Sequence, residues 1–173
     1  MASAAPQSSS SDTAPKGSIA AYHLEQNRQF LVVVDETAEL DAAIRYACTR
    51  ARSTGGKIAL LYVYDVDPDF MHYEFVKELA DREARDDAEG VLRVYAQRVL
   101  KETGREPDLY VRKGNRRDQL FKLVKENPEL SMLILSSAVG KKPGPLVEAV
   151  TGKFAGKVGI PVTVVPGLAK DSA

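Results

Sequence analysis

Apolar residues along this chain group into short runs and longer periodic segments that alternate with one another. Four runs are apolar at nearly every position, which is typical of parallel strands covered on both faces. A fifth run alternates only in part, as edge strands do. The four continuous runs are residues 29–34, 57–64, 132–135 and 160–165, and the partly alternating run is 107–112.

Each gap between these runs carries the three-to-four spacing of an amphipathic helix. The first helix has its apolar stripe at Leu40, Ala43, Ile44, Ala47 and Ala51. Thr37 is its predicted N-cap, because a threonine hydroxyl can accept from a free backbone N–H there. Gly55 and Gly56 end it. Cys48 lies beside the stripe and is interpreted as a small packing residue.

A long helical segment is predicted from about residue 70 to 103 and is closed by Gly104. Its apolar positions include Phe75, Leu79, Ala84, Ala88, Val91, Leu92, Tyr95 and Val99. The next helix follows Asn115, which can cap it, and Asn127-Pro128 stops it. The last helix has Pro145 in its first turn, where a missing N–H costs nothing.

The predicted order is therefore βαβαβαβαβ. Strands joined through helices must pair in parallel with right-handed crossovers. We expect an α/β fold, a doubly wound parallel sheet with helices on both faces that form a three-layer sandwich.

Composition narrows the possible classes of function. Lys plus Arg and Asp plus Glu balance at 24 each, so no global field favours nucleic acid or an anionic membrane. No apolar run approaches the roughly 20 residues needed to cross a bilayer. One Cys and two His make a zinc or haem site unexpected, and no metal site is assigned. Neither histidine, His23 or His72, has the partners of a catalytic base.

The chain is expected to form one domain at residues 28–168, with short tails at 1–27 and 169–173. The first tail is rich in Ser and Ala, lacks an apolar signal region and contains too few apolar residues to repay the entropy of ordering. We therefore expect it to be disordered and the protein to be cytoplasmic.

The candidate binding residues lie at or just after the ends of predicted strands. Residues 133–167 predict a strand, a Gly/Pro-rich turn, a helix and a second strand, the arrangement in which α/β proteins hold phosphates. Asp35 follows the first strand and can accept hydrogen bonds from a ribose or adenine, or else stabilise its own turn. Ser136 and Ser137 can donate to phosphate, or satisfy backbone groups at the strand end. Lys141 can neutralise phosphate charge, or only solubilise a loop.

Other candidate motifs carry less weight. Residues 53–57, STGGK, resemble part of a phosphate-binding loop but end a helix and enter a strand, which is the wrong context. Asp65, Asp67 and Asp69 alternate in one loop without the glycine and distal glutamate of a calcium loop, so a solvated loop is favoured.

Taken together in order and spacing, five stretches of the sequence resemble the universal stress protein family over nearly all of residues 28–167. These stretches are FLVVVDETAELDAAIRYACTRA, GKIALLYVYD, LYVRKGN, LILSSAVG and GIPVTVVPG. The resemblance implies a five-stranded sheet in the order 3-2-1-4-5. It places a ligand crevice outside the carboxyl ends of strands one and four. The family position that matches Asp35 contacts nucleotide.

Nucleotide-binding members carry Gly-x-x-Gly, nine further residues, then Gly-Ser or Gly-Thr. Here Ser136 stands where the first glycine is expected, and the available series is Gly140, Gly144 and Gly152, followed by Lys153. The resemblance therefore implies a weak or degenerate site for ATP or AMP. Its residues are Asp35, Ser136, Ser137, Gly140, Lys141, Gly144 and Gly152.

The resemblance also implies a homodimer that pairs through the last strand, Pro161 to Val165, whose apolar, uncharged edge favours such pairing. The function expected is that of a non-catalytic stress-response regulator. Two alternatives stay open: an interaction module of the same fold that binds no nucleotide, and an adenine-nucleotide hydrolase-like enzyme. The enzyme is disfavoured because neither an SGGxDS-type nor an HxGH-type motif occurs.

Overall fold

The computed structural model of the protein describes residues 28–66, 74–140 and 142–167. The expectations for the two tails, for both histidines, for Asp67 and Asp69 and for Lys141 lie outside these residues.

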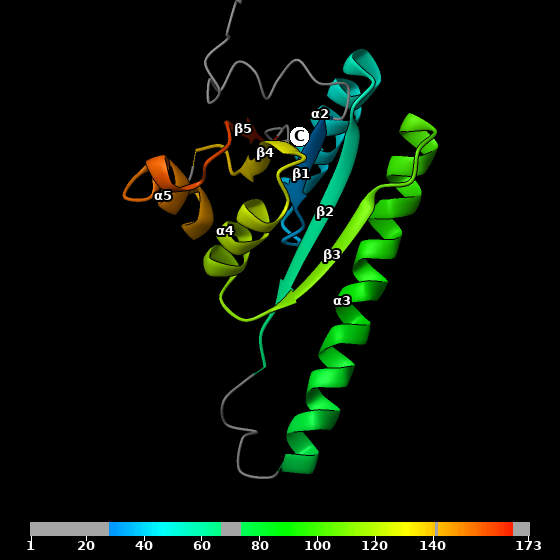
Figure 1. Ribbon diagram of the computed structural model, residues 1–173, viewed down its shortest axis with the longest axis vertical. Helices are drawn as coiled ribbons and strands as arrows, with labels where there is room; N and C mark the ends of the chain where they lie inside the picture. Colours follow the sequence, from blue (N-terminus) through cyan, green and yellow to red (C-terminus); the bar gives the residue numbers. More distant parts are fainter. Residues whose placement is uncertain (1–27, 67–73, 141, 168–173) are drawn as a thin grey trace, which may run out of the picture.

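Five parallel strands form one sheet in the order β3-β2-β1-β4-β5, which confirms the expected fold and order (Figure 1). The strands are β1 (Gln29–Val33), β2 (Lys57–Tyr64), β3 (Asp108–Lys113), β4 (Leu130–Ser137) and β5 (Val162–Pro166). In the centre of the sheet, Leu31 pairs with Ala59 on one side and with Leu133 on the other. All five residues of β1 are buried, as its continuous apolar run predicts.

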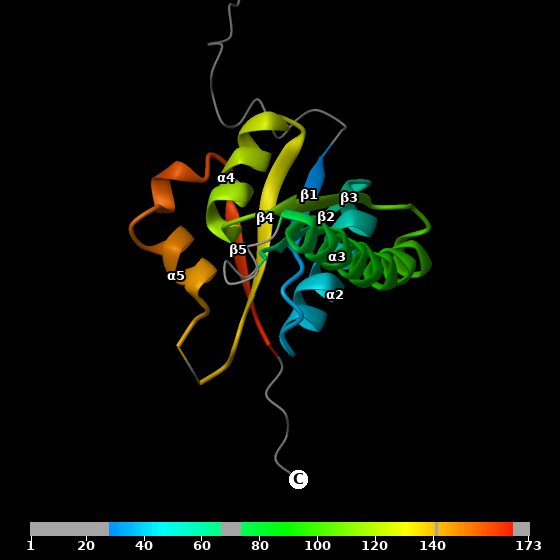
Figure 2. The same cartoon turned by 90° about the horizontal axis from the view of Figure 1, so that it is seen from below.

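Helices cover both faces of the sheet (Figure 2). The helices α2 (Leu40–Thr54) and α3 (Glu74–Thr103) pack on one face. The helices α4 (Arg116–Glu126) and α5 (Pro145–Thr151), with the short turn η2 (Ala155–Lys157), pack on the other. Alternate residues of each central strand point into opposite clusters, so that Val32 joins the α2/α3 side and Val33 the α4/α5 side.

The start of α2 differs from the prediction that Thr37 caps it. The residue before the helix is Glu39, which makes no side-chain cap bond. The Thr37 hydroxyl instead donates to Asp35 Oδ1 at 2.8 Å, so it is already used in the turn after β1. The predicted end is confirmed, because Gly55 adopts a left-handed φ of 71° directly after α2.

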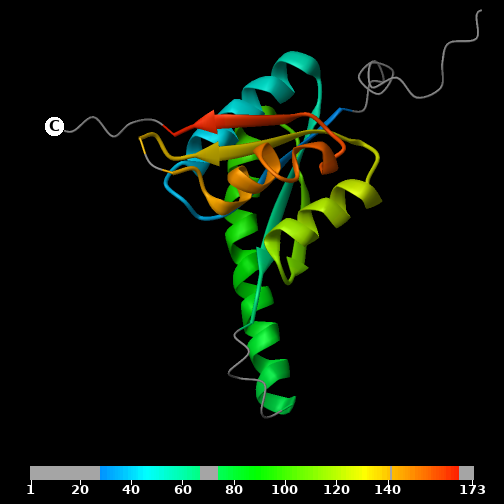
Figure 3. The same cartoon turned by 90° about the vertical axis from the view of Figure 1, so that its left-hand side faces the viewer.

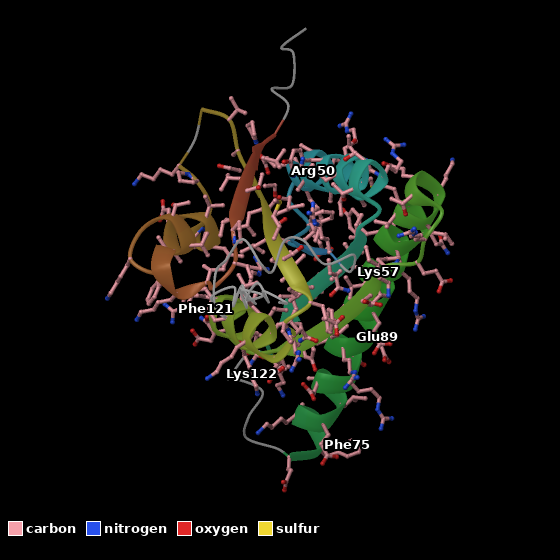
Figure 4. All side chains as sticks on the ribbon, turned by 45° about the horizontal axis from the view of Figure 1, so that its top comes forward. Arg50, Lys57, Phe75, Glu89, Phe121 and Lys122 are labelled. Atoms are coloured by element: carbon pink, nitrogen blue, oxygen red, sulfur yellow. The ribbon has the colours of Figure 1, made fainter. Side chains whose placement is uncertain are left out.

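Helix α3 is longer than the sheet that it covers. Ala88, Leu92 and Val99 are its buried residues, whereas Phe75 is 77% and Leu79 is 47% exposed. Figures 3 and 4 show why: the first turns of α3, where Phe75 is labelled, extend past the ends of the strands. The amphipathic pattern of α3 therefore continues beyond the core.

The two edges of the sheet differ in charge. At one edge, three of the six residues of β3 are charged, namely Asp108, Arg112 and Lys113. The other edge is β5, with the sequence VTVVP and no charged residue. Both strands therefore lie where the sequence placed them.

Cys48 is completely buried under α2, which confirms it as a packing residue. Burial raises the pKa of its thiol to about 12, with the nearby Glu102 carboxylate adding to the effect. Thiolate chemistry at this position is therefore suppressed.

Candidate functional site

A pocket of about 420 Å³ lies at the carboxyl ends of β1 and β4, on the α4/α5 face. Its lining residues are Val33, Asp35, Thr37, Asn115, Arg116, Arg117, Leu135, Ser136, Gly144, Pro145, Leu146, Val147 and Ala149. Strands β1 and β4 are neighbours whose chain connections leave in opposite directions, which is where open α/β sheets bind ligands. The volume lies within the roughly 300–1,000 Å³ of small-molecule sites.

The wall of the pocket at the end of β1 is a tightly bonded turn. Asp35 Oδ1 accepts from both the Thr37 backbone N–H, at 3.2 Å, and the Thr37 hydroxyl, at 2.8 Å. The second carboxylate oxygen of Asp35 has no partner among the described residues. Asp35 therefore stabilises its turn and still presents a free acceptor at the pocket.

The next residue, Glu36, holds this turn from the opposite side of the sheet. Its φ of 57° is the one positive value of a non-glycine residue in the described chain. Its carboxylate accepts from the Tyr62 hydroxyl at 2.6 Å. Burial first, and then this hydrogen bond, raise the pKa of Tyr62 to about 12, while the charge of Arg116 acts in the other direction.

At the end of β4 only part of the predicted set reaches the pocket. Ser136 lines it, and the buried Leu135 forms part of its floor. Ser137 is not among the lining residues. Its backbone carbonyl accepts from the Gly167 N–H at 2.8 Å and so extends the pairing with β5.

Of the three predicted glycines, too, only one lines the pocket. Gly144 lines the pocket as the residue before α5, with Pro145 in the first turn as predicted. Gly140 has a left-handed φ of 72° and lies in the turn after β4, outside the lining. Gly152 follows α5 and is also outside it. A Cβ there would meet the Glu148 carbonyl oxygen at 2.8 Å, so its requirement for glycine is steric.

The start of α4 forms a third wall of the pocket. The sequence pattern predicted no role in the site for this segment. The Asn115 side chain accepts from the Asp118 N–H at 3.2 Å, which confirms it as the cap of α4. Arg116 and Arg117 follow it and both line the pocket. Two arginines in a first helical turn, where acids are preferred, are the signal that could have pointed to this wall.

Arg117 belongs to a basic group around one aromatic ring. Its guanidinium carbon lies 4.7 Å from the centre of the Phe154 ring. The Nζ atoms of Lys157 and Lys153 lie 5.1 and 5.8 Å from the same centre. Phe121 of α4 packs edge-on against Phe154 with 6.0 Å between ring centroids. Positive charge therefore gathers on the α4 and η2 side of the pocket.

Within the described residues, no group of three or more His, Cys, Asp or Glu side chains is placed to hold a metal ion. Of the helices that the structure describes, none is both long enough and apolar enough to span a bilayer.

Comparison with known proteins points to one family. The model of the universal stress protein family matches residues 26–166. No curated protein matches the chain.

Solved structures share the fold at low sequence identity. The universal stress protein UspA from Lactobacillus plantarum has a TM-score of 0.64 at 20% identity, over 80% of this chain and 97% of that one. A universal stress protein in complex with cAMP has a TM-score of 0.55 at 16% identity, over 80% and 95% of the two chains. A family member from Arabidopsis thaliana with AMP bound has a TM-score of 0.55 at 16% identity, over 84% and 95%.

Proposed function

Because this chain belongs to the universal stress protein family, we propose that it is a regulatory protein that binds an adenine nucleotide at the ends of β1 and β4. The observation that carries the proposal is the composition of the pocket. Its lining combines apolar side chains, Asp35 and Ser136 at the ends of β1 and β4, and Arg116 and Arg117 at the start of α4. A nucleotide combines the same three chemistries in its base, ribose and phosphates.

The free oxygen of Asp35 is the proposed contact to the ribose. A carboxylate oxygen accepts hydroxyl donors strongly, and the bonds from Thr37 hold this one in place. The buried Val33, Leu135 and Val147 offer the base an apolar surface. Relatives of this fold that contain cAMP and AMP support the ligand class.

We propose that binding is weaker than in family members with the complete glycine pattern. Gly140 and Ser137 do not line the pocket, and Gly152 sits behind α5. The backbone cradle that the glycine pattern would build therefore has no counterpart in the lining of this pocket.

The proposed action is non-catalytic. The bound nucleotide would change the conformation or the partner preference of a cytoplasmic protein whose folded unit is residues 28–168. The connection between β1 and α2, residues 34–39, is the element that a ligand would contact, because Asp35 and Thr37 both line the pocket.

Calorimetric titration with AMP and ATP tests the proposal, with an Asp35→Asn variant alongside. Asn keeps the oxygen that accepts from Thr37 but removes the charge, so the turn is preserved while the ribose contact weakens. We expect saturable binding by the wild type and about tenfold lower affinity in Asp35→Asn, about 1.4 kcal/mol.

The matched control is Asp86→Asn, which removes the same charge from an exposed position of α3, remote from the pocket. Its affinity should equal that of the wild type. Flat titrations of the wild type at millimolar nucleotide would reject the proposal and leave the interaction module without nucleotide as the function. Nucleotide turnover that follows enzyme concentration would reject the non-catalytic role.

We further propose a homodimer that pairs through Pro161–Val165 and the rest of β5. In the single chain Val162, Val164 and Val165 remain only partly buried, and the strand has a free edge without charge. Sedimentation should give twice the mass of the chain, and Val164→Lys should shift the population toward single chains. A monomeric wild type would contradict this proposal.

A further inference from the structure

Four positive side chains stand together on one side of the pocket, and the proposed contacts to base and ribose leave them unused. We call this set the basic rim: Arg116, Arg117, Lys153 and Lys157. The first two line the pocket, and the two lysines share the Phe154 ring with Arg117. Among the described residues, Asp118 is the one acid that forms an ion pair with the rim, so positive charge is in excess there.

Arg117 has partners on two sides. Its Nε donates to Asp118 Oδ1 at 2.9 Å, and its Nη2 lies 2.8 Å from the same oxygen in an ion pair. Its guanidinium carbon lies over the ring of Phe154, which packs edge-on against Phe121. The Nη1 end makes no bond within the described residues, so it keeps donors for a ligand. A guanidinium held in this way loses little conformational freedom when it binds an anion.

Arg116 is free to move toward a ligand. It is exposed, and within the described part of the chain it has neither an ion pair nor a side-chain hydrogen bond. Its charge reaches the ends of the strands, because it acts on the pKa of Tyr62. An unpaired arginine at the mouth of a pocket supplies a planar fork of donors that fits a phosphate.

The turn after β4 is less well placed for this task. Ser137 pairs with β5, and Gly140 lies outside the lining. Of the described residues in the predicted phosphate-holding set, Ser136 and Gly144 reach the pocket. Ser136 and Gly144 carry no charge. Among the described residues, Arg116 and Arg117 are the cations that line the pocket, whereas Lys142 in the turn after β4 does not line it.

We propose that the basic rim is the phosphate-recognition site of this pocket and that it selects nucleotides with two or three phosphates over nucleosides and monophosphates. The inference rests on the proposed nucleotide function and assigns its phosphate contacts to Arg116 and Arg117. Added salt should weaken the contribution of each phosphate, because the rim is exposed to solvent.

The test compares adenosine, AMP, ADP and ATP by calorimetry at low and high salt, with inorganic tripolyphosphate as a further ligand. The variant is Arg116→Gln/Arg117→Gln, since glutamine keeps most of the side-chain stem over Phe154. The control is Arg45→Gln/Arg50→Gln, which removes the same two charges from exposed positions of α2. Figure 4 shows Arg50 on α2, well away from Phe121 and the α4 side.

We expect the wild type to bind ATP at least about tenfold more tightly than adenosine, and salt to reduce this ratio. In Arg116→Gln/Arg117→Gln the ratio should fall toward one with the adenosine affinity unchanged, while the control keeps the ratio. If Arg116→Gln/Arg117→Gln kept the wild-type ratio of ATP affinity to adenosine affinity, the proposed role of the basic rim would be overturned. Binding of tripolyphosphate without binding of adenosine would support phosphate recognition by the basic rim and would reject the proposed base and ribose contacts. If no ligand bound, both proposals would be rejected.

Discussion

The helices that cover the two faces of the sheet differ in length. On one face α2 and α3, of 15 and 30 residues, cover the strands. On the other, α4 and α5 have 11 and 7 residues. The pocket lies there, between the starts of these two helices and the ends of β1 and β4. The same strands therefore support a core on each side, and the α4/α5 side also carries the pocket at the ends of the strands. We call the α2/α3 side the closed face and the α4/α5 side the open face.

One group from each face illustrates the difference. On α2 the thiol of Cys48 is sealed from solvent, and its pKa is raised to about 12 by burial. Beside the open pocket stand Arg116 and Arg117, which line it from the first turn of α4. Both faces contain a buried apolar core and should contribute to stability, whereas the proposed ligand binding should depend on the open face alone.

The largest expected effect is on the closed face. Leu92→Ala removes a fully buried side chain of α3 and should lower the free energy of unfolding by about 3 kcal/mol through lost burial and a cavity. Leu79→Ala, the same change on the same helix, affects a side chain that is 47% exposed. It should cost about 0.5 kcal/mol or less. Urea unfolding followed by circular dichroism measures both, and equal losses would show that Leu79 is covered in solution.

The next effect concerns the open face. Ala149→Phe places a ring in the pocket that Ala149 lines. Nucleotide affinity should fall at least about tenfold, while the free energy of unfolding changes by about 1 kcal/mol or less, because the ring enters empty space. The control is Ala80→Phe, at a half-buried position of α3. If Ala149→Phe instead destabilised the fold and left nucleotide affinity unchanged, Ala149 would be packed in the α4/α5 core and would not line a binding site.

The smallest effect appears only at alkaline pH. The pKa of Tyr62 is about 12, raised by burial and by its bond to Glu36 from an ordinary value of 10. Between these values the folded chain keeps a proton that the unfolded chain loses, so stability is full below pH 10 and falls as pH rises toward 12. Tyr62→Phe should flatten this fall without changing its direction, since Tyr64 and Tyr95 also have raised pKa values. Unfolding curves from pH 9 to 12 measure how steeply the free energy of unfolding falls with pH. Identical slopes for the wild type and Tyr62→Phe would contradict the raised pKa of Tyr62.

Most of the fold follows from local pattern. Continuous apolar runs identify the strands, and Asn115, Pro145 and Gly55 mark helix ends where the structure has them. The strand order came from the family resemblance, since pairing between distant segments leaves no local signal. The sequence pattern did not predict which apolar residues of α3 are buried. Phe75 fits the helical pattern but lies beyond the end of the sheet, a boundary that the pattern does not contain.

The site was predictable only in part, for a geometric reason. Asp35, Ser136 and Gly144 follow strands that the fold brings together, and they do line the pocket. Asn115, Arg116 and Arg117 belong to a wall that follows β3, an edge strand two places away from β1 in the sheet. Their approach to Asp35 depends on the direction in which α4 crosses back over the sheet. Neighbouring sequence does not encode that direction.

The contrast between the two sheet edges limits how far assembly can proceed. A two-fold axis beside β5 would join two copies into one continuous sheet and would leave β3 at both outer ends. There Asp108, Arg112 and Lys113 oppose the addition of another strand. In the proposed homodimer, association would therefore end at two copies, and the chain would not extend into a fibre.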